Sequence, residues 1–144
     1  MEPFDHYPRK GKQPLGIPPK GNNIARRDYG PYTFQDCGYA CAYCGQDLGA
    51  SYESWLSISV DHVVPISTRW YEAREGWIED RFNRVTCCRA CNEFLNAYRC
   101  RYKKPNDVAG FVQIRDKVFL GKRQRAKDRH QVERTWYRHN VHTP

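Results

Sequence analysis

Four cysteines in two CxxC pairs have the residue type and spacing of metal ligands. Within the 144 residues, Cys41 and Cys44 form a first cysteine pair, and Cys88 and Cys91 form a second. Two such pairs wrap four thiolates around a tetrahedral zinc ion. The chain has seven cysteines, an odd number, and starts without the apolar run of a secretory signal, so we expect a reducing, cytoplasmic setting that disfavours disulfides. We therefore predict a structural Zn²⁺ on these four thiols.

The choice of zinc ligands leaves two alternatives open. Cys37 and Cys87 each closely precede a CxxC pair, so either one can replace a predicted ligand. Gly45 follows Cys44 and favours the first pair as written, because a zinc-binding turn is sharp and glycine tolerates a positive φ. Three histidines near the C-terminus are spaced too irregularly to indicate a second metal site: His130, His139 and His142.

Polar side chains that can do acid–base and metal chemistry accompany the cysteine pairs. They are a carboxylate, an imidazole and two amides: Asp61, His62, Asn83 and Asn92. Imidazole titrates near neutral pH, so His62 is a candidate general base for a water molecule. Oxygen atoms of Asp61 and Asn92 suit a hard divalent cation such as Mg²⁺ or Mn²⁺. Taken singly, each is an ordinary turn or helix-cap residue, whereas their order and separation indicate a catalytic function.

The elements that must position these residues read as strand, turn, strand and helix. Residues 56–60 alternate apolar and polar side chains, as in a half-buried strand, and Pro65 forces a turn soon afterwards. Residues 82–88 predict a second short strand, and residues 92–98 predict a helix. The intervening segment 67–80 predicts a loop or a short helix. This order predicts an α+β core.

The C-terminal part is predicted to be helical and basic. Asn106 or Asp107 can cap a helix whose apolar side chains form one broad face up to Phe119. Gly121 interrupts that pattern, so we expect more than one C-terminal helix. Beyond it, basic residues occur on all sides and are expected to contact the phosphates of double-stranded DNA. The residues assigned to this contact are Lys122, Arg123, Arg125, Lys127, Arg129 and Arg134.

The cysteine pairs and the polar residues that accompany them resemble the HNH endonucleases, in the zinc-containing subtype of the ββα-metal superfamily. The matching segments within residues 37–98 are Cys41-x-x-Cys44-Gly45, Asp61-His62-Val63-Val64-Pro65, Asn83-Arg84-Val85-Thr86 and Cys88-x-x-Cys91-Asn92. The third family position is often histidine, and this chain has Asn92 there. Asn96 lies one helical turn later, and we interpret it as an ordinary helix residue rather than as part of the site.

This resemblance implies a ββα-metal (HNH) nuclease fold held by the structural zinc, and a function as a metal-dependent DNA endonuclease. His62 is then the general base, and Asn83 completes the catalytic set by tying the turn and orienting that base. Asp61 and Asn92 hold one catalytic Mg²⁺ or Mn²⁺, which relieves charge on the phosphate and on the leaving 3′ oxygen. The products implied carry 5′-phosphate and 3′-hydroxyl ends.

Charge is distributed unevenly along the chain. Lys and Arg number 24 against 16 Asp and Glu, for a net charge of +8. Residues 99–144 carry a net +9 and residues 31–98 a net −4. Strongly basic surfaces attract polyanions such as DNA. We expect three parts: an extended, basic, proline-rich arm (1–31), a catalytic core with the zinc site (32–104), and a basic helical extension (105–144).

Other classes of protein are excluded or stay as alternatives. No apolar stretch reaches the roughly 18 residues of a membrane span. The main alternative is a non-catalytic, zinc-stabilised nucleic-acid-binding module, which Asp61 and His62 disfavour because binding alone requires neither. An RNase is a second alternative, since the hydrolysis is chemically similar. The oligomeric state stays open, and no heptad pattern or clear apolar interface indicates a dimer.

Overall fold

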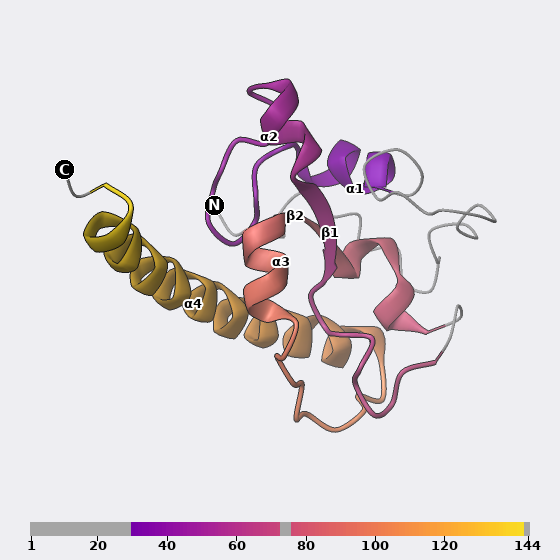
Figure 1. Cartoon of the computed structure of the whole chain (residues 1–144). Helices are drawn as coiled ribbons and strands as arrows, with labels where there is room; N and C mark the ends of the chain where they lie inside the picture. Colours follow the sequence, from indigo (N-terminus) through magenta and orange to yellow (C-terminus); the bar gives the residue numbers. More distant parts are fainter. Residues whose placement is uncertain (1–29, 73–75, 143–144) are drawn as a thin grey trace.

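The computed structural model describes residues 30–72 and 76–142 as a mixed α and β structure (Figure 1). Its helices are α1 (Gly30–Cys37), α2 (Tyr52–Leu56), α3 (Arg89–Leu95) and α4 (Val108–Asn140), and its strands are β1 (Ile58–His62) and β2 (Arg84–Cys88). Two 3-10 turns, η1 (Trp77–Glu79) and η2 (Arg81–Asn83), lie between the strands. The predicted α+β class is confirmed. The predicted N-terminal arm lies outside the described residues, except for positions 30 and 31, which belong to α1.

The strands β1 and β2 form a two-stranded antiparallel sheet. The register pairs Ile58 with Cys88 and His62 with Arg84, so the end of β1 lies beside the start of β2. Every residue of β2 is buried, whereas buried and half-buried side chains alternate at the start of β1. The alternation that predicted a strand over 56–60 therefore belongs to a strand that begins and ends two residues later.

The second strand runs directly into α3 without a connecting loop. Cys88 ends β2 and also caps α3, because its Sγ accepts a hydrogen bond from the backbone N–H of Cys91 at 3.4 Å. The backbone N–H of Arg89 donates to the carbonyl of Ser57 at 2.9 Å, and α3 packs against both strands. The strand–helix junction is therefore held firmly at the place where the second cysteine pair lies.

The core lies between the sheet, the connection between its strands, and the first half of α4. Val63 and Phe82 from the connection are fully buried, as are Phe111 and Phe119 from α4. The rings of Phe82 and Phe111 meet edge to face, with centroids 5.4 Å apart. Arg115 is buried among them and donates from Nη1 to the Phe82 carbonyl at 2.9 Å. These contacts make the first half of α4 part of the same core as the connection between the strands. Each buried apolar side chain contributes roughly 1.5–3 kcal/mol to the stability of that core.

A single 33-residue helix, α4, replaces the several C-terminal helices that we predicted. Asp107 caps it by accepting a hydrogen bond from the backbone N–H of Gly110 at 2.8 Å. Gly121 lies inside the helix, where a Cβ would come within 2.8 Å of the Tyr98 hydroxyl oxygen. That glycine therefore permits close packing instead of ending the helix, at a cost of about 1 kcal/mol in helix propensity.

The second half of α4 leaves the core. Residues 131–140 are all exposed, and Figure 1 shows this end of the helix projecting away from the strands. Most of its exposed side chains are polar or charged, although Val132, Trp136 and Tyr137 are exposed as well. Among the described residues, no helix combines the length and the apolar character needed to cross a membrane.

Candidate functional site

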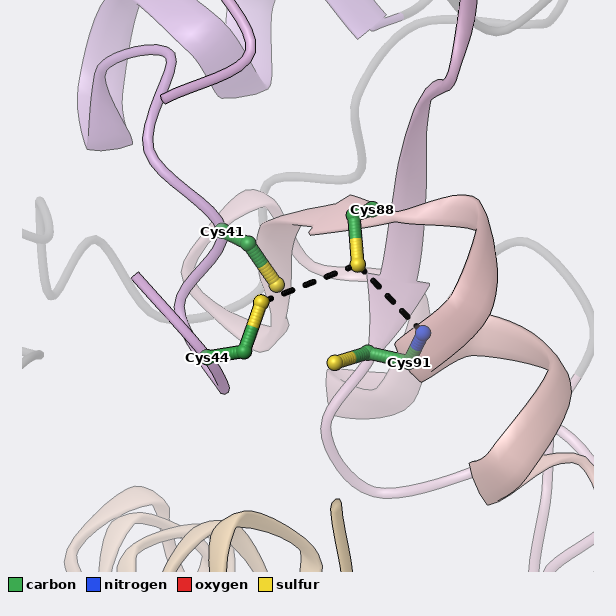
Figure 2. A group of neighbouring side chains, drawn as sticks. All are labelled: Cys41, Cys44, Cys88 and Cys91. Carbon is green, nitrogen blue, oxygen red and sulfur yellow. Dashed lines mark hydrogen bonds between the residues drawn. The ribbon is translucent and has the colours of Figure 1, made fainter. Parts of the chain in front are cut away.

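Four cysteine side chains converge between the loop after α1 and the junction of β2 with α3 (Figure 2). The Sγ atoms of the two cysteine pairs all lie within 4.8 Å of one another, and those of Cys44 and Cys88 are 3.8 Å apart. Four thiolates held at about 2.3 Å from a tetrahedral zinc ion would be about 3.8 Å apart. The four cysteines that the spacing predicted are therefore positioned to hold a metal ion such as zinc.

The backbone of the first cysteine pair turns sharply at Gly45. Gly45 has a φ of 79°, and its N–H donates to the carbonyl of Cys41 at 2.8 Å. The N–H of Ala42 donates to the carbonyl of Thr86 at 2.9 Å, which attaches this turn to β2. Both cysteine pairs thus belong to one hydrogen-bonded unit. Hydrogen bonding with the other thiols, first with that of Cys44, lowers the pKa of Cys41, which favours a thiolate ready for a metal.

The two alternative cysteine ligands lie outside this cluster. Cys37 donates from Sγ to the carbonyl of Arg84 at 3.7 Å, at the end of β2 away from the second pair. Cys87 donates from Sγ to the carbonyl of Cys88 at 3.2 Å, and it is fully buried. The Cys87 thiol also interacts with that of Cys41, so Cys87 adjoins the cluster without being one of its four members.

His130 of α4 reaches the cysteine cluster, which the sequence analysis did not predict. Its Nε2 lies 3.1 Å from the Sγ of Cys91, and its ring meets that of Phe94 edge to face. Burial lowers the pKa of His130, so a neutral imidazole is favoured there. An Nε2–H tautomer would donate to the Cys91 sulfur. The signal was available: Val118, Lys122, Ala126 and His130 recur every fourth residue along the buried side of α4.

Asp61, at the end of β1, is bound by two donors from distant parts of the chain. Its Oδ2 accepts hydrogen bonds from the Tyr43 hydroxyl at 2.5 Å and from the Lys122 ammonium at 2.7 Å. Lys122 also donates to the carbonyl of His62 at 2.8 Å. Lys122 is only 1% exposed, so its predicted contact with DNA is wrong. Its long side chain points inward from the buried side of α4, and Asp61 compensates its charge.

His62 pairs with a glutamate that the sequence analysis did not single out. Its Nε2 lies 3.4 Å from Oε2 of Glu79 in η1. Glu79 also accepts from Arg84 Nη2 at 2.6 Å and from the Tyr71 hydroxyl at 2.7 Å. The hydrogen bond with His62, followed by that from Tyr71, lowers the pKa of Glu79 although burial opposes this. An ionised Glu79 favours a proton on Nε2 of His62, which leaves the Nδ1 lone pair to accept a proton.

Asn83 is fully buried and holds the connection between the strands. Its Nδ2 donates to the carbonyls of Val64 at 3.0 Å and Ile78 at 2.8 Å, and its Oδ1 accepts from the N–H of Val64 at 3.0 Å. The carbonyl of Asn83 also accepts from Val63 N–H. The two N–H groups of the Asn83 side chain thus bind one backbone carbonyl close to His62 in sequence and one next to Glu79. Asn83 acts on the turn and does not need to contact a substrate.

Asn92 lies in the first part of α3, directly after Cys91, and is half-buried. Because α3 packs against β1, the predicted oxygen donors Asp61 and Asn92 belong to neighbouring elements. Lys122 and Tyr43 both use Oδ2 of Asp61, so Oδ1 is the carboxylate oxygen that the described residues leave for a cation. Oxygen donors of this kind suit Mg²⁺ or Mn²⁺. In the described part of the chain, only the cysteine cluster brings together three or more His, Cys, Asp or Glu ligands.

The basic residues predicted to contact DNA are divided between two grooves along α4. Arg123, Lys127 and Arg134 line a groove of about 500 Å³ beside the first cysteine pair, and none of the described carboxylates lines it. Arg125 and Arg129 line a second groove beside α3, together with two carboxylates, Glu93 and Glu133. Among the described residues, the charged side chains that line the first groove are all cations, so this groove suits a polyanion better than the second one.

No protein-family model, curated protein or solved structure matches this chain. The function proposed below therefore rests on the chemistry and the positions of its own residues.

Proposed function

We propose that the protein is a metal-dependent DNA endonuclease of the HNH type. The observation that carries the proposal is the pair formed by His62 and an ionised Glu79, next to Asp61 at the end of a strand. In this proposal, Nδ1 of His62 takes a proton from the attacking water, and Glu79 holds Nε2–H and stabilises the resulting imidazolium. Asn83 keeps the turn that carries both groups in place.

Asp61 and Asn92 would hold the divalent ion in this proposal. A bound Mg²⁺ or Mn²⁺ supplies charge neutralisation at the scissile phosphate and the leaving 3′ oxygen. The tie from Lys122 and Tyr43 fixes the orientation of the Asp61 carboxylate, so that Oδ1 is presented in one direction. The cysteine cluster is assigned a structural zinc, whose four protein ligands leave no open position for catalysis.

The groove lined by Arg123, Lys127 and Arg134 supports DNA as the substrate. Its cations lie along one side of α4 at spacings of four and seven residues, so they can follow a chain of phosphates. Such contacts supply affinity that is independent of base sequence and decreases steeply with salt.

Plasmid cleavage tests the proposal. Zinc-loaded protein is incubated with supercoiled DNA in Mg²⁺, in Mn²⁺, and without either ion, and with a structured RNA of equal nucleotide content. The proposal predicts relaxed or linear DNA only when a divalent ion is added, and little RNA breakdown. Cleavage that does not depend on added divalent ions contradicts the metal role, and preferential breakdown of RNA supports an RNase instead.

A non-catalytic, zinc-stabilised nucleic-acid-binding module is the second candidate. One observation favours it: the Lys122 ammonium already compensates Asp61 inside the protein, and it would repel a divalent cation on the same carboxylate. This module would bind DNA in gel shifts and leave the plasmid intact in every divalent ion. It would also bind Mn²⁺ no better than an Asp61→Asn variant does.

A further inference from the structure

A hollow lined by basic residues lies apart from the two grooves along α4, between the loop after β1 and the loop after α3. It has a volume of about 640 Å³, and four cationic side chains line it: Arg69, Arg99, Arg101 and Lys103. Trp70 and Tyr102 also line it. None of these six residues was assigned to a binding site from the sequence.

Two loops that are distant in the sequence build this hollow. Residues 63–71 and 96–107 lie side by side below β1 and α3 in Figure 1, and the indole N–H of Trp70 donates to the carbonyl of Tyr102 at 2.9 Å. Trp70 also meets Phe111 of the core edge to face, with ring centroids 6.0 Å apart. The hollow is therefore attached to the core and has a defined shape.

The charge of the hollow is uncompensated. Within the described residues, the hollow is lined by four cationic side chains and by no carboxylate, and none of the four cations forms an ion pair. The neighbouring Lys104 differs, because it pairs with Glu72. Cations gathered around a concave surface repel one another and concentrate anions there. The hollow thus suits a ligand with several negative charges.

The hollow adjoins the candidate active site. The loop that carries Arg69 and Trp70 begins directly after His62. On the other loop, Cys100 lines the hollow and lies near enough to Lys122 for an electrostatic interaction. Lys122 in turn contacts Asp61 and the carbonyl of His62. A strand bound in the hollow would therefore pass near the residues proposed to cut it.

We propose that this hollow binds backbone phosphates of the DNA substrate, with Arg69, Arg99, Arg101 and Lys103 as the phosphate-binding residues. The identity of the ligand rests on the proposed function, and the site extends it by adding a contact surface separate from α4. Arginine binds phosphate with two parallel hydrogen bonds, and three of the four cations are arginines. The contacts are expected to be independent of base sequence.

The test is binding of a fluorescein-labelled 30-base-pair duplex, followed by anisotropy over a range of KCl concentrations without Mg²⁺ or Mn²⁺. The Arg99→Gln/Arg101→Gln variant should lose roughly tenfold in affinity at low salt, and the slope of log affinity against log salt should decrease by about 1.8. The matched control, Arg89→Gln/Arg138→Gln, removes the same charge from exposed positions that line neither this hollow nor the two grooves along α4, and it should change both quantities much less.

The outcomes separate this inference from the proposed nuclease. Equal losses in the two double variants would show that only net charge matters and would overturn the inference, as would duplex binding that the hollow variant retains in full. If the wild type cuts plasmid and the hollow variant still binds normally, the inference fails while the nuclease stands. If the hollow variant alone loses affinity and the wild type cuts nothing, the inference stands while the nuclease fails. Zinc content and thermal unfolding check each variant, and Arg69→Gln/Lys103→Gln replaces the first pair if that pair loses zinc.

Discussion

At the scale of single residues, Glu79 is the group on which the candidate active site depends most. It accepts hydrogen bonds from Tyr71 and Arg84 and faces Nε2 of His62. These partners lower its pKa below the value of about 4.3 that a glutamate has in an unfolded chain. At a pH between the pKa of Glu79 in the folded protein and its pKa in the unfolded chain, the unfolded chain binds more protons than the folded protein does. The stabilisation from Glu79 is therefore complete above about pH 5 and is lost as the pH falls toward the folded-state pKa.

We therefore predict a pH-dependent effect of Glu79→Gln. At pH 7 the variant should lose about 2 kcal/mol of unfolding free energy, because charged hydrogen bonds are replaced by weaker ones. The difference from the wild type should narrow as the pH is lowered below about 4.3. Urea unfolding at a series of pH values measures this, with Glu93→Gln at an exposed position of α3 as control. A difference that stays constant down to pH 3 would contradict the ionised state assigned to Glu79.

His130 gives a second prediction at this scale. Its Nε2 lies 3.1 Å from the Sγ of Cys91. Mutation of a residue that hydrogen-bonds to a metal ligand typically lowers metal affinity 10- to 100-fold. His130→Ala should therefore release zinc to a chromogenic chelator roughly tenfold faster than the wild type. His139→Ala, at an exposed position further along α4, should release zinc at the wild-type rate. Indistinguishable rates for His130→Ala and the wild type would show that the contact does not act on the metal.

At the scale of elements, the parts that the sequence predicted well are those in which local spacing decides the structure. Two CxxC pairs, the alternation leading to β1 and the run leading to β2 are local patterns, and all three are present. The contact of His62 with Glu79 spans 17 residues and depends on how η1 folds back, which no motif indicates. The short helix α2 is held by a local cap from Ser51 and buries no residue, so it has no apolar periodicity to detect.

The helix α4 shows why burial was harder to predict than helicity. Basic residues occur on all its sides, so charge alone does not distinguish Lys122 inside the protein from Arg123 outside it. Gly121 reads as a break, whereas its role depends on Tyr98 from another part of the chain. Both errors concern tertiary contacts, which depend on the packing of α4 on α3 and on the link from Lys122 to Asp61 in β1.

The link between α4 and β1 supports a prediction about stability. Lys122→Met removes the buried ammonium and leaves Oδ2 of Asp61 with Tyr43 alone, which should cost about 3 kcal/mol in urea unfolding. Arg129→Met, which breaks an exposed pair with Glu133 and removes the guanidinium from above the Phe94 ring, should cost less than about 1 kcal/mol. Combining Lys122→Met with Asp61→Asn should recover part of the loss, because the unpaired charge is then removed. If Lys122→Met and Arg129→Met lowered the unfolding free energy equally, the buried pair of Lys122 and Asp61 would not stabilise the fold.

At the scale of the whole molecule, acidic and basic residues occupy different environments. Acidic residues of the central part pair internally, as Asp36 does with Arg81 and Glu79 with Arg84. Some cations of α4 (Arg123, Lys127 and Arg134) and those of the loop after α3 instead line concave surfaces that, among the described residues, contain no carboxylate. The excess positive charge is thus placed on surfaces that can receive a polyanion. This arrangement is consistent with the proposed action on DNA.

The most direct test of the proposed nuclease is the rate of the first strand break in supercoiled plasmid, measured with zinc-loaded protein in excess and with Mg²⁺ or Mn²⁺. Wild type, His62→Ala and Asn96→Ala are compared, since Asn96 is exposed at the end of α3 and serves as the matched control. We predict equal rates for the wild type and Asn96→Ala, and a rate roughly 10²- to 10⁴-fold lower for His62→Ala. Equal rates in all three proteins, or no break by the zinc-loaded wild type, would contradict the proposed function.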